Sequence, residues 1–324
     1  MKQLLMMAIA AACLLVGAQS CKDSETATPP AVHPRANAVY YWKTVFDLTE
    51  QDRKFLRDHD VERMYVRFFD VVSESPDLDG EDPRPIPNAT IRFDSVAPGV
   101  RSVVPVVYIT VDALKEMTYS DLYAGHIVSR VDNMCSYHGI TNVDEFQLDC
   151  DWTPETAELF FNLCRDIKQK LGDRKLSATI RLHQLRQPAP PVDYGVLMVY
   201  NTGSFRDPAC ENSILSYSDV KPYLTGNVSY PLPLDFAYPT YSWDLVYDQG
   251  GQFKGIARDS TYRLDPGDRI RRETSEYSEV SKVKRLVEEK LAGDSSSVIL
   301  YHLDSDNLSK FSSDEIESLY HIGR

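Results

Sequence analysis

Residues 144–152 read Asp-Glu-Phe-Gln-Leu-Asp-Cys-Asp-Trp. The two-residue period of a β-strand places Gln147, Asp149 and Asp151 on one face and Phe146, Leu148, Cys150 and Trp152 on the other. The second set is apolar enough to be covered by helices, so we expect the acidic face to line the interior or the mouth of an enclosed structure. Two like charges about 6 to 7 Å apart on one strand would raise the pKa of one of the carboxyl groups, as acid–base chemistry requires.

Strand-like apolar runs alternate with helical patterns along the rest of the chain. With the acidic strand as the fourth of eight, the other predicted strands cover residues 39–42, 63–69, 103–109, 176–182, 196–200, 234–238 and 298–303. Strands joined by helices imply right-handed crossovers and a parallel sheet, and eight such strands predict an α/β fold of the closed (β/α)8 barrel type. An open doubly wound sheet is the alternative, but no glycine-rich loop follows any of these strands.

The predicted helices cover residues 50–59, 119–137, 154–171, 278–291 and 314–321. Thr153 is the expected N-cap of the third of these, with Pro154 at its first position. Two longer connections interrupt the alternation and read as insertions. One follows the second strand at 73–98, and the other follows the seventh strand at 242–277 and is expected to contain a hairpin.

The N-terminus has the features of a secreted lipoprotein. Residues 1–20 combine Lys2 with a short apolar run, as in a signal peptide, and the small residues before Cys21 resemble a bacterial lipobox. An ordinary secretory signal is the alternative. Residues 21–36 read as a flexible tether, and its first residues resemble the acidic tag of surface lipoproteins of the Bacteroides group. We expect a lipid on Cys21, a place in the bacterial cell envelope at the outer membrane, and a single barrel domain over 37–324.

Composition limits the partners and cofactors. The net charge is −13, which disfavours nucleic acid as a partner. Four cysteines follow Cys21, too few for a disulfide framework in a chain of this length, and none has metal-ligand spacing. With no phosphate-binding loop either, the sequence predicts no metal and no cofactor.

Polar and aromatic side chains gather near the predicted carboxyl ends of the strands, where barrel enzymes build their sites. These residues are Arg67, Asp70, Tyr108, Gln147, Asp149, Asp151, Arg181, Tyr200, Asn201, Tyr238, Tyr241, His302 and Asp304. Each has a structural explanation as well, because Arg67 and Arg181 could pair with the acids to fill the barrel centre. Together they predict a site at this end of the barrel.

Two motifs resemble those of chitinase-like glycoside hydrolases of family 18. The segment from Asp144 to Asp151 is similar to the family's fourth-strand motif D-x-x-D-x-D-x-E, and Met198-Val-Tyr200-Asn201 is similar to its sixth-strand Met-x-Tyr-Asp/Asn. Gln147 stands where the family has Asp, and Asp151 stands where it has the catalytic Glu. Residues 146–185 also resemble a barrel family of bacterial lipoproteins and secreted proteins without an assigned function.

The chitinase resemblance implies substrate-assisted glycoside hydrolysis. Asp151 would protonate the leaving oxygen, Asp149 would orient the substrate N-acetyl group that acts as nucleophile, and Tyr200 would hydrogen-bond that group. Asp is one methylene shorter than Glu, so Asp151 would reach about 1 Å less far. A direct two-carboxylate mechanism with an acid from another strand, such as Asp70 or Asp304, is the alternative.

Three functional hypotheses follow. The first is a glycoside hydrolase-like lipoprotein that acts on a glycan, with Tyr238, Tyr241 and Trp243 stacking on sugar rings. The second is a non-catalytic barrel that binds a glycan or outer-membrane protein partners. The third is a structural lipoprotein in which Arg67 and Arg181 neutralise the fourth-strand acids.

Overall fold

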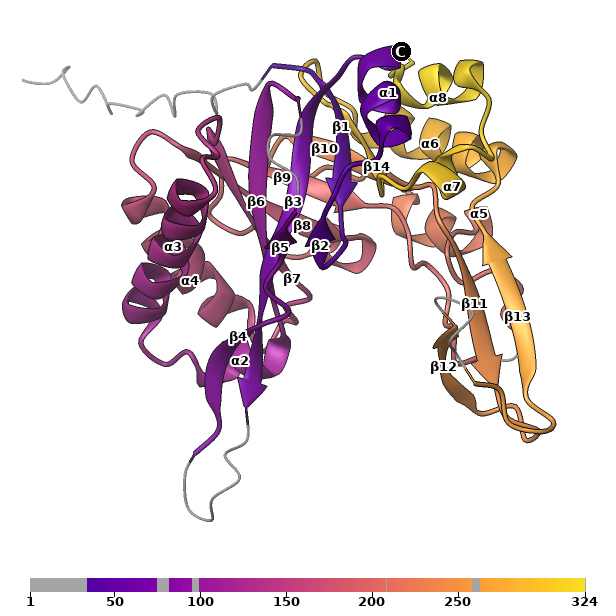
Figure 1. Cartoon of the computed structure of the whole chain (residues 1–324), viewed down its shortest axis with the longest axis horizontal. Helices are drawn as coiled ribbons and strands as arrows, with labels where there is room; N and C mark the ends of the chain where they lie inside the picture. Colours follow the sequence, from indigo (N-terminus) through magenta and orange to yellow (C-terminus); the bar gives the residue numbers. More distant parts are fainter. Residues whose placement is uncertain (1–33, 75–81, 95–98, 208, 258–262, 324) are drawn as a thin grey trace, which may run out of the picture. The chain divides into compact units, whose positions relative to one another are not determined.

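The computed structural model describes residues 34–74, 82–94, 99–207, 209–257 and 263–323 (Figure 1). The predicted signal peptide, Cys21 and most of the predicted tether lie outside the described residues. Val32–Arg324 is one compact unit, and the following description concerns that unit.

Eight parallel strands form a closed barrel. Around the barrel they are β1 (Asn37–Tyr41), β14 (Val298–Tyr301), β10 (Leu234–Pro239), β9 (Tyr194–Met198), β8 (Lys175–Arg181), β7 (Glu145–Cys150), β6 (Ser102–Ile109) and β3 (Val61–Glu74). The pairing of β1 with β3 closes the sheet. The predicted (β/α)8 barrel is therefore confirmed, and the open sheet is excluded.

Most strands are followed by helices. The α-helices are α1 (Glu50–Asp58), α2 (Val111–Glu116), α3 (Ser120–Tyr137), α4 (Ala157–Lys170), α5 (Tyr217–Val220), α6 (Tyr277–Leu291), α7 (Ser305–Leu308) and α8 (Ser313–Tyr320), with 3-10 helices η1 (Leu182–Arg186) and η2 (Lys221–Leu224). The predicted start of α4 is wrong by three residues. Thr156 is its N-cap, because Thr153 and Pro154 belong to a preceding turn in which the Thr156 N–H donates to the Thr153 carbonyl.

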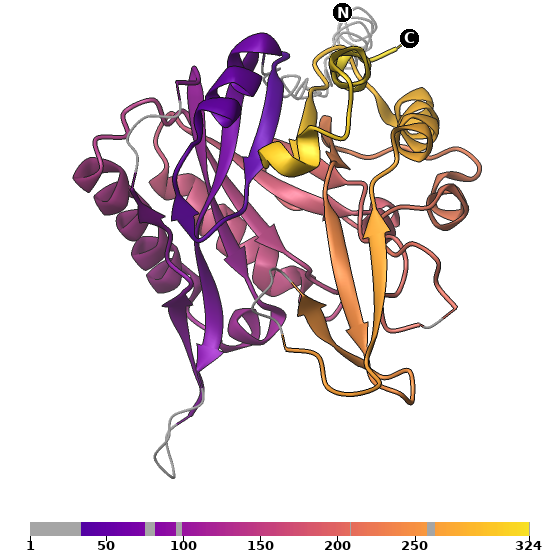
Figure 2. The same cartoon turned by 45° about the vertical axis from the view of Figure 1, so that its right-hand side comes forward.

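Both long connections contain additional strands. Between β3 and β6 lie β4 (Arg84–Asn88), which pairs antiparallel with β3, and β5 (Arg92–Phe93), which pairs with the short β2 (Val45–Phe46). Between β10 and α6, β11 (Ser242–Tyr247) pairs antiparallel with β12 (Phe253–Ala257) and β13 (Arg269–Thr274). Figures 1 and 2 show this three-stranded sheet, in orange, as a separate layer beside the barrel.

Alternation along the strands separates two apolar clusters. The interior cluster consists of Ala38, Tyr40, Tyr65, Val104, Val106, Tyr194, Val196, Met198, Tyr200, Ala237 and Ile299, with Trp42 and Tyr301 packed against it. The larger outer cluster includes Phe146, Leu148 and Cys150 of β7 and lies between the strands and the helices. The intervening Gln147 and Asp149 are also buried and face inward, as the period of the acidic strand predicts.

Gly195 on β9 provides a test of this packing. A Cβ atom there would lie 2.7 Å from Ile180 Cγ1 and 2.9 Å from Leu234 Cδ2. We expect Gly195→Ala to lower the free energy of unfolding by about 1 to 3 kcal/mol in urea denaturation, because the core would be overpacked. Gly125→Ala in α3 is the control, because the nearest contact of its Cβ would be Lys170 Cε at 3.9 Å. Equal stability of the two variants would contradict the packing described.

Candidate functional site at the barrel mouth

Arg181, at the end of β8, lies between the two carboxylates predicted on the acidic strand. Its Nε donates a hydrogen bond to Asp151 Oδ1, and its Nη2 lies 3.5 Å from Asp149 Oδ1. The Asp151 side chain is 47% exposed, whereas that of Asp149 is 4% exposed. One guanidinium therefore serves both an open carboxylate at the mouth and a buried one below it.

The surroundings of Asp149 favour its neutral form more than water does. Burial raises the pKa of Asp149, and the nearby Asp151 adds to the rise, while the Arg181 guanidinium opposes it. Thr179 Oγ1 donates a 2.6 Å hydrogen bond to Asp149 Oδ1. Tyr108 lies beside Asp149 in the register of β6 and β7, and burial together with the two carboxylates raises the pKa of Tyr108 to about 12.

A β-bulge on β3 brings Arg67 and Asp70 to the mouth together. The register with β6 shifts between Arg67 and Phe69, so one extra residue is inserted there. Such a bulge changes the direction of the following side chains. Arg67 then donates to both carboxylate oxygens of Asp70, with 2.7 Å from Nε to Oδ1.

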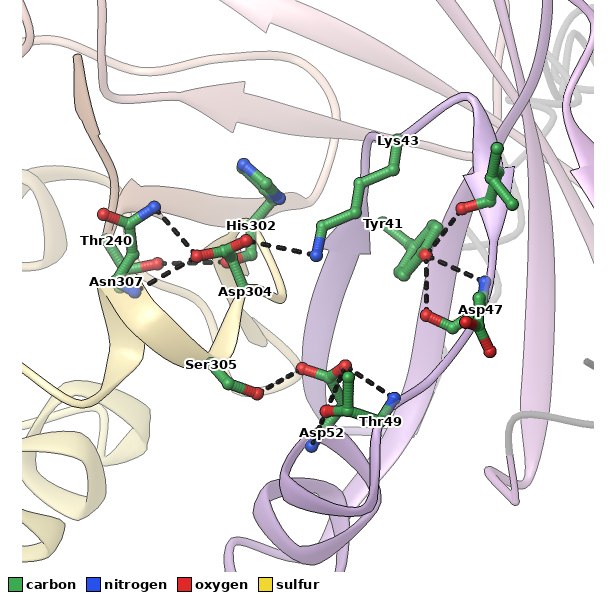
Figure 3. A network of polar contacts seen from close by, with 11 residues as sticks. Tyr41, Lys43, Asp47, Thr49, Asp52, Thr240, His302, Asp304, Ser305 and Asn307 are labelled. Carbon is green, nitrogen blue, oxygen red and sulfur yellow. Dashed lines mark hydrogen bonds and ion pairs between the residues drawn. The ribbon is translucent and has the colours of Figure 1, made fainter. Parts of the chain in front are cut away.

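Asp304 and His302 follow β14, and Figure 3 shows Asp304 between Lys43 and Asn307. Asp304 lies 3.1 Å from Lys43 Nζ and accepts from the Asn307 N–H as the N-cap of α7. Burial by itself would raise the pKa of Asp304, but the hydrogen bonds with Lys43 and Asn307 outweigh it and lower that pKa. For His302, a cationic group when protonated, burial lowers the pKa, so its imidazole is neutral near pH 7.

Five aromatic side chains form a continuous wall at the mouth, here called the aromatic wall. They are Trp42, Tyr200, Tyr241, Trp243 and Tyr301. Tyr301 is central, because it stacks on Tyr200 at 4.6 Å and lies 6.0 Å from Trp42 and 5.6 Å from Tyr241. Trp42, Trp243 and Tyr301 are partly exposed, so their faces or edges are accessible to a ligand.

Hydrogen bonds fix the site residues that follow β9 and β10. Tyr241 OH donates to Asn201 Oδ1 at 2.6 Å, and Asn201 has a φ of +54°, a conformation that asparagine tolerates better than most residues. Tyr200 OH donates to Met198 Sδ at 3.2 Å, and Arg181 Nη1 lies 2.7 Å from the same sulfur. The side chains of Tyr200 and Arg181 therefore share the Met198 sulfur as a hydrogen-bond acceptor.

Two of the predicted residues do not reach the mouth. Gln147 is fully buried, where its Oε1 accepts from Tyr40 OH and its Nε2 donates to Ser177 Oγ. Tyr238 is also fully buried and belongs to the outer cluster on the side of α6, since Ala237 takes the inward position of β10. We therefore do not include either residue among the groups available to a ligand.

The sequence analysis missed two residues of the aromatic wall and one cation. Trp42 follows β1, Tyr301 ends β14, and Lys43 pairs with Asp304. The strand-end rule that selected the other residues could have found Trp42 and Tyr301, because both lie in or at the end of predicted strands. Lys43 directly follows the predicted strand 39–42, so the same rule could have selected it, but not its pairing with Asp304, which is more than 250 positions away in the chain.

Neither a metal site nor a membrane span is found in the part of the chain that the structure describes. No three acidic, histidine or cysteine side chains are grouped there as metal ligands would be. None of the described helices combines the length and the apolar character needed to cross a bilayer.

The barrel is similar to solved structures of a spore cortex-lytic enzyme, a GH18 chitinase and a pseudo-chitinase. The spore cortex-lytic enzyme SleL of Bacillus cereus superposes with a TM-score of 0.55 at 12% identity, over 90% of this chain and 76% of that one. The GH18 chitinase of Cycas revoluta in complex with (GlcNAc)3 gives a TM-score of 0.51 at 12% identity, over 87% and 97%. Human YKL-39, described as a pseudo-chitinase with retained chitooligosaccharide binding properties, gives 0.52 at 8% identity, over 88% and 98%.

Comparison of the amino-acid sequence with known proteins identifies no related protein. No model of a protein family matches the chain, and no curated protein matches it. At identities this low, the structural likeness establishes the chitinase-like fold and leaves the activity to be argued from the site.

Removal of Arg181 tests the electrostatics of the site. Because the pKa of Asp149 is raised in the folded state, that state binds more protons than the unfolded chain, and stability falls as the pH rises above about 4. Arg181→Met removes the cation that opposes this shift. We expect the variant to lose about 3 kcal/mol at pH 7 and to lose stability more steeply with rising pH than the wild type.

Urea denaturation at several pH values measures both effects. Arg101→Met is the control, because Arg101 makes an exposed ion pair with Glu62 at 3.5 Å, and such pairs contribute about 0 to 1 kcal/mol. If the free energy of unfolding changed with pH in the same way for Arg181→Met and the wild type, the pKa of Asp149 would not depend on Arg181.

Proposed function

We propose that the barrel mouth binds a glycan containing N-acetylhexosamine and does not hydrolyse it. One observation carries the proposal: each carboxylate considered as an acid or a nucleophile has a cationic partner. Arg181 contacts Asp149 and Asp151, Arg67 contacts Asp70, and Lys43 contacts Asp304.

Asp151 is poorly suited to act as the general acid. A general acid must hold a proton and deliver it to the leaving oxygen, whereas the Oδ1 of Asp151 accepts a hydrogen bond from the Arg181 guanidinium. Its side chain is also one methylene shorter than the family's Glu, and a displacement of about 1 Å costs on the order of a hundredfold in rate. Asp149 cannot take over this role easily, because it is almost fully buried.

The aromatic wall supports a sugar ligand. Flat apolar rings can stack on pyranose faces, while the neighbouring carboxylates, amide and guanidinium groups can hydrogen-bond to the hydroxyl and acetamido groups. The similarity to YKL-39 supports this combination, since that protein is described as retaining chitooligosaccharide binding as a pseudo-chitinase.

Titration with chitooligosaccharides tests the proposal. We expect calorimetric binding of (GlcNAc)4 to the wild type, with no release of reducing ends on prolonged incubation. Trp42→Ala should weaken binding at least tenfold, about 1.4 kcal/mol, because it removes a partly exposed ring of the aromatic wall.

Tyr119→Ala is the matched control, since Tyr119 is a 75% exposed aromatic residue at the start of α3. Its affinity should equal that of the wild type. Absence of binding to any glycan in a broad panel, measured on folded protein, would refute glycan binding. If both substitutions weakened glycan binding equally, the glycan would not bind specifically at the mouth.

Hydrolysis is the second candidate function. The half-exposed Asp151 next to Asp149, whose pKa burial raises, is an arrangement that acid–base chemistry can use. Release of reducing ends that disappears in Asp151→Asn but persists in Trp42→Ala would replace the binding proposal with a glycosidase.

We further propose that a lipid on Cys21 anchors the protein in the bacterial outer membrane, where it could contact outer-membrane protein partners. The support is the lipobox-like sequence before Cys21. Metabolic labelling with a radioactive fatty acid in a Gram-negative host should label the wild type and not Cys21→Ala, and the variant should leave the membrane fraction. Equal labelling of both proteins would contradict the anchor.

A further inference from the structure

A pocket lies on the outer side of the barrel, between β3, β4 and α3. Its volume is about 620 Å³, within the range of about 300 to 1,000 Å³ that small-molecule sites occupy. In most (β/α)8 barrels a helix follows each strand and covers the sheet. Here β3 is followed by the antiparallel β4 instead, and the surface that a helix would cover contributes to this pocket.

The walls of the pocket are mostly apolar. They include Phe69 and Val71 of β3, Ile86 of β4, and Ile127, Met134 and Tyr137 of α3. The same bulge that brings Arg67 and Asp70 to the mouth leaves Phe69 in the outer cluster. Tyr137 is 85% exposed at one end of the pocket.

Arg130 of α3 is the lining residue whose contacts indicate what kind of ligand the pocket binds. Its guanidinium lies 5.1 Å from the centre of the Phe69 ring, and its Nη2 donates to Thr90 Oγ1 at 2.9 Å. Its Nε is buried and has no hydrogen-bond partner among the described residues. Such a donor lacks the acceptor that buried charged groups normally have.

The charge of the pocket is opposite to that of the chain. The net charge of the chain is −13, yet among the described residues that line the pocket there is one arginine, Arg130, and no aspartate or glutamate. In the described structure Arg67, Arg174 and Arg181 each pair with a carboxylate, whereas Arg130 has no such partner. The pocket therefore combines an apolar cavity with one uncompensated positive charge.

We propose that this pocket binds a small hydrophobic carboxylic acid. The apolar part of the ligand packs between β3, β4 and α3, and its carboxylate accepts hydrogen bonds from Arg130. A neutral apolar molecule would leave Nε without an acceptor, and a cation would be repelled by the guanidinium. The proposal is independent of glycan binding, because the pocket lies outside the barrel and shares no residue with the mouth.

Calorimetry with sodium decanoate tests the proposal on the whole protein. We expect saturable binding of one decanoate per chain, at least tenfold tighter than binding of 1-decanol, because a hydrogen bond to a charged group contributes about that factor. Arg130→Met should weaken decanoate binding at least tenfold. Arg165→Met on α4 is the control, because Arg165 is exposed and hydrogen-bonds to Asn162, away from the pocket.

Asn133→Trp is a second variant that does not depend on the charge. Asn133 lines the pocket and is exposed, so a larger side chain there should block the cavity without disturbing the core, and decanoate binding should be lost. Three results would overturn the proposal: no saturable decanoate binding, equal affinity for decanoate and 1-decanol, or undiminished binding in Asn133→Trp. A thermal melt of each variant confirms that it is folded.

Discussion

The pairing of β1 with β3, which closes the parallel sheet, is the constraint on which the rest of the structure depends. In a closed barrel every side chain of a strand faces either the enclosed interior or the surrounding helices. Polar residues that face inward are therefore removed from water, and each requires a partner within the barrel. This requirement explains why Gln147 bonds to Tyr40 and Ser177, and why Asp149 lies between Thr179 and Arg181. The same closure collects the strand ends, and the side chains they carry, at one mouth.

The charges at that mouth form local pairs. Breaking a buried ion pair by removal of one partner is costly, so Arg181 is needed to compensate the burial of Asp149. The pairs leave the carboxylates as fixed hydrogen-bond acceptors beside an aromatic wall, which suits recognition of a sugar more than proton transfer. The barrel is similar to both chitinases and a pseudo-chitinase, and under the proposed function the pairing of Asp151 with Arg181 is the feature that favours binding over hydrolysis.

Much of the fold could be predicted from the sequence, because eight apolar runs of strand length alternate with amphipathic helices. The start of α4 was missed because Thr153 and Pro154 have the composition of a helix start but form a turn. Strand-end reasoning placed Arg67, Asp70, Asp149, Asp151 and Arg181 at the mouth and considered that Arg67 and Arg181 pair with the fourth-strand acids. Arg181 does contact Asp149 and Asp151, whereas the bulge in β3 brings Arg67 to Asp70 instead. It also placed Tyr238 at the mouth, because a residue at the end of a strand can face either side. The pocket beside Arg130 could not be predicted, since it depends on the antiparallel pairing of β4 with β3 beside α3.

A crystal structure of the protein grown with (GlcNAc)4 tests the central claim most directly. The account predicts an intact tetrasaccharide at the mouth, stacked on the aromatic wall, with Arg181 still bonded to Asp151. Cleaved sugars in the mouth, with Asp151 released from Arg181 and directed at the scissile bond, would contradict it.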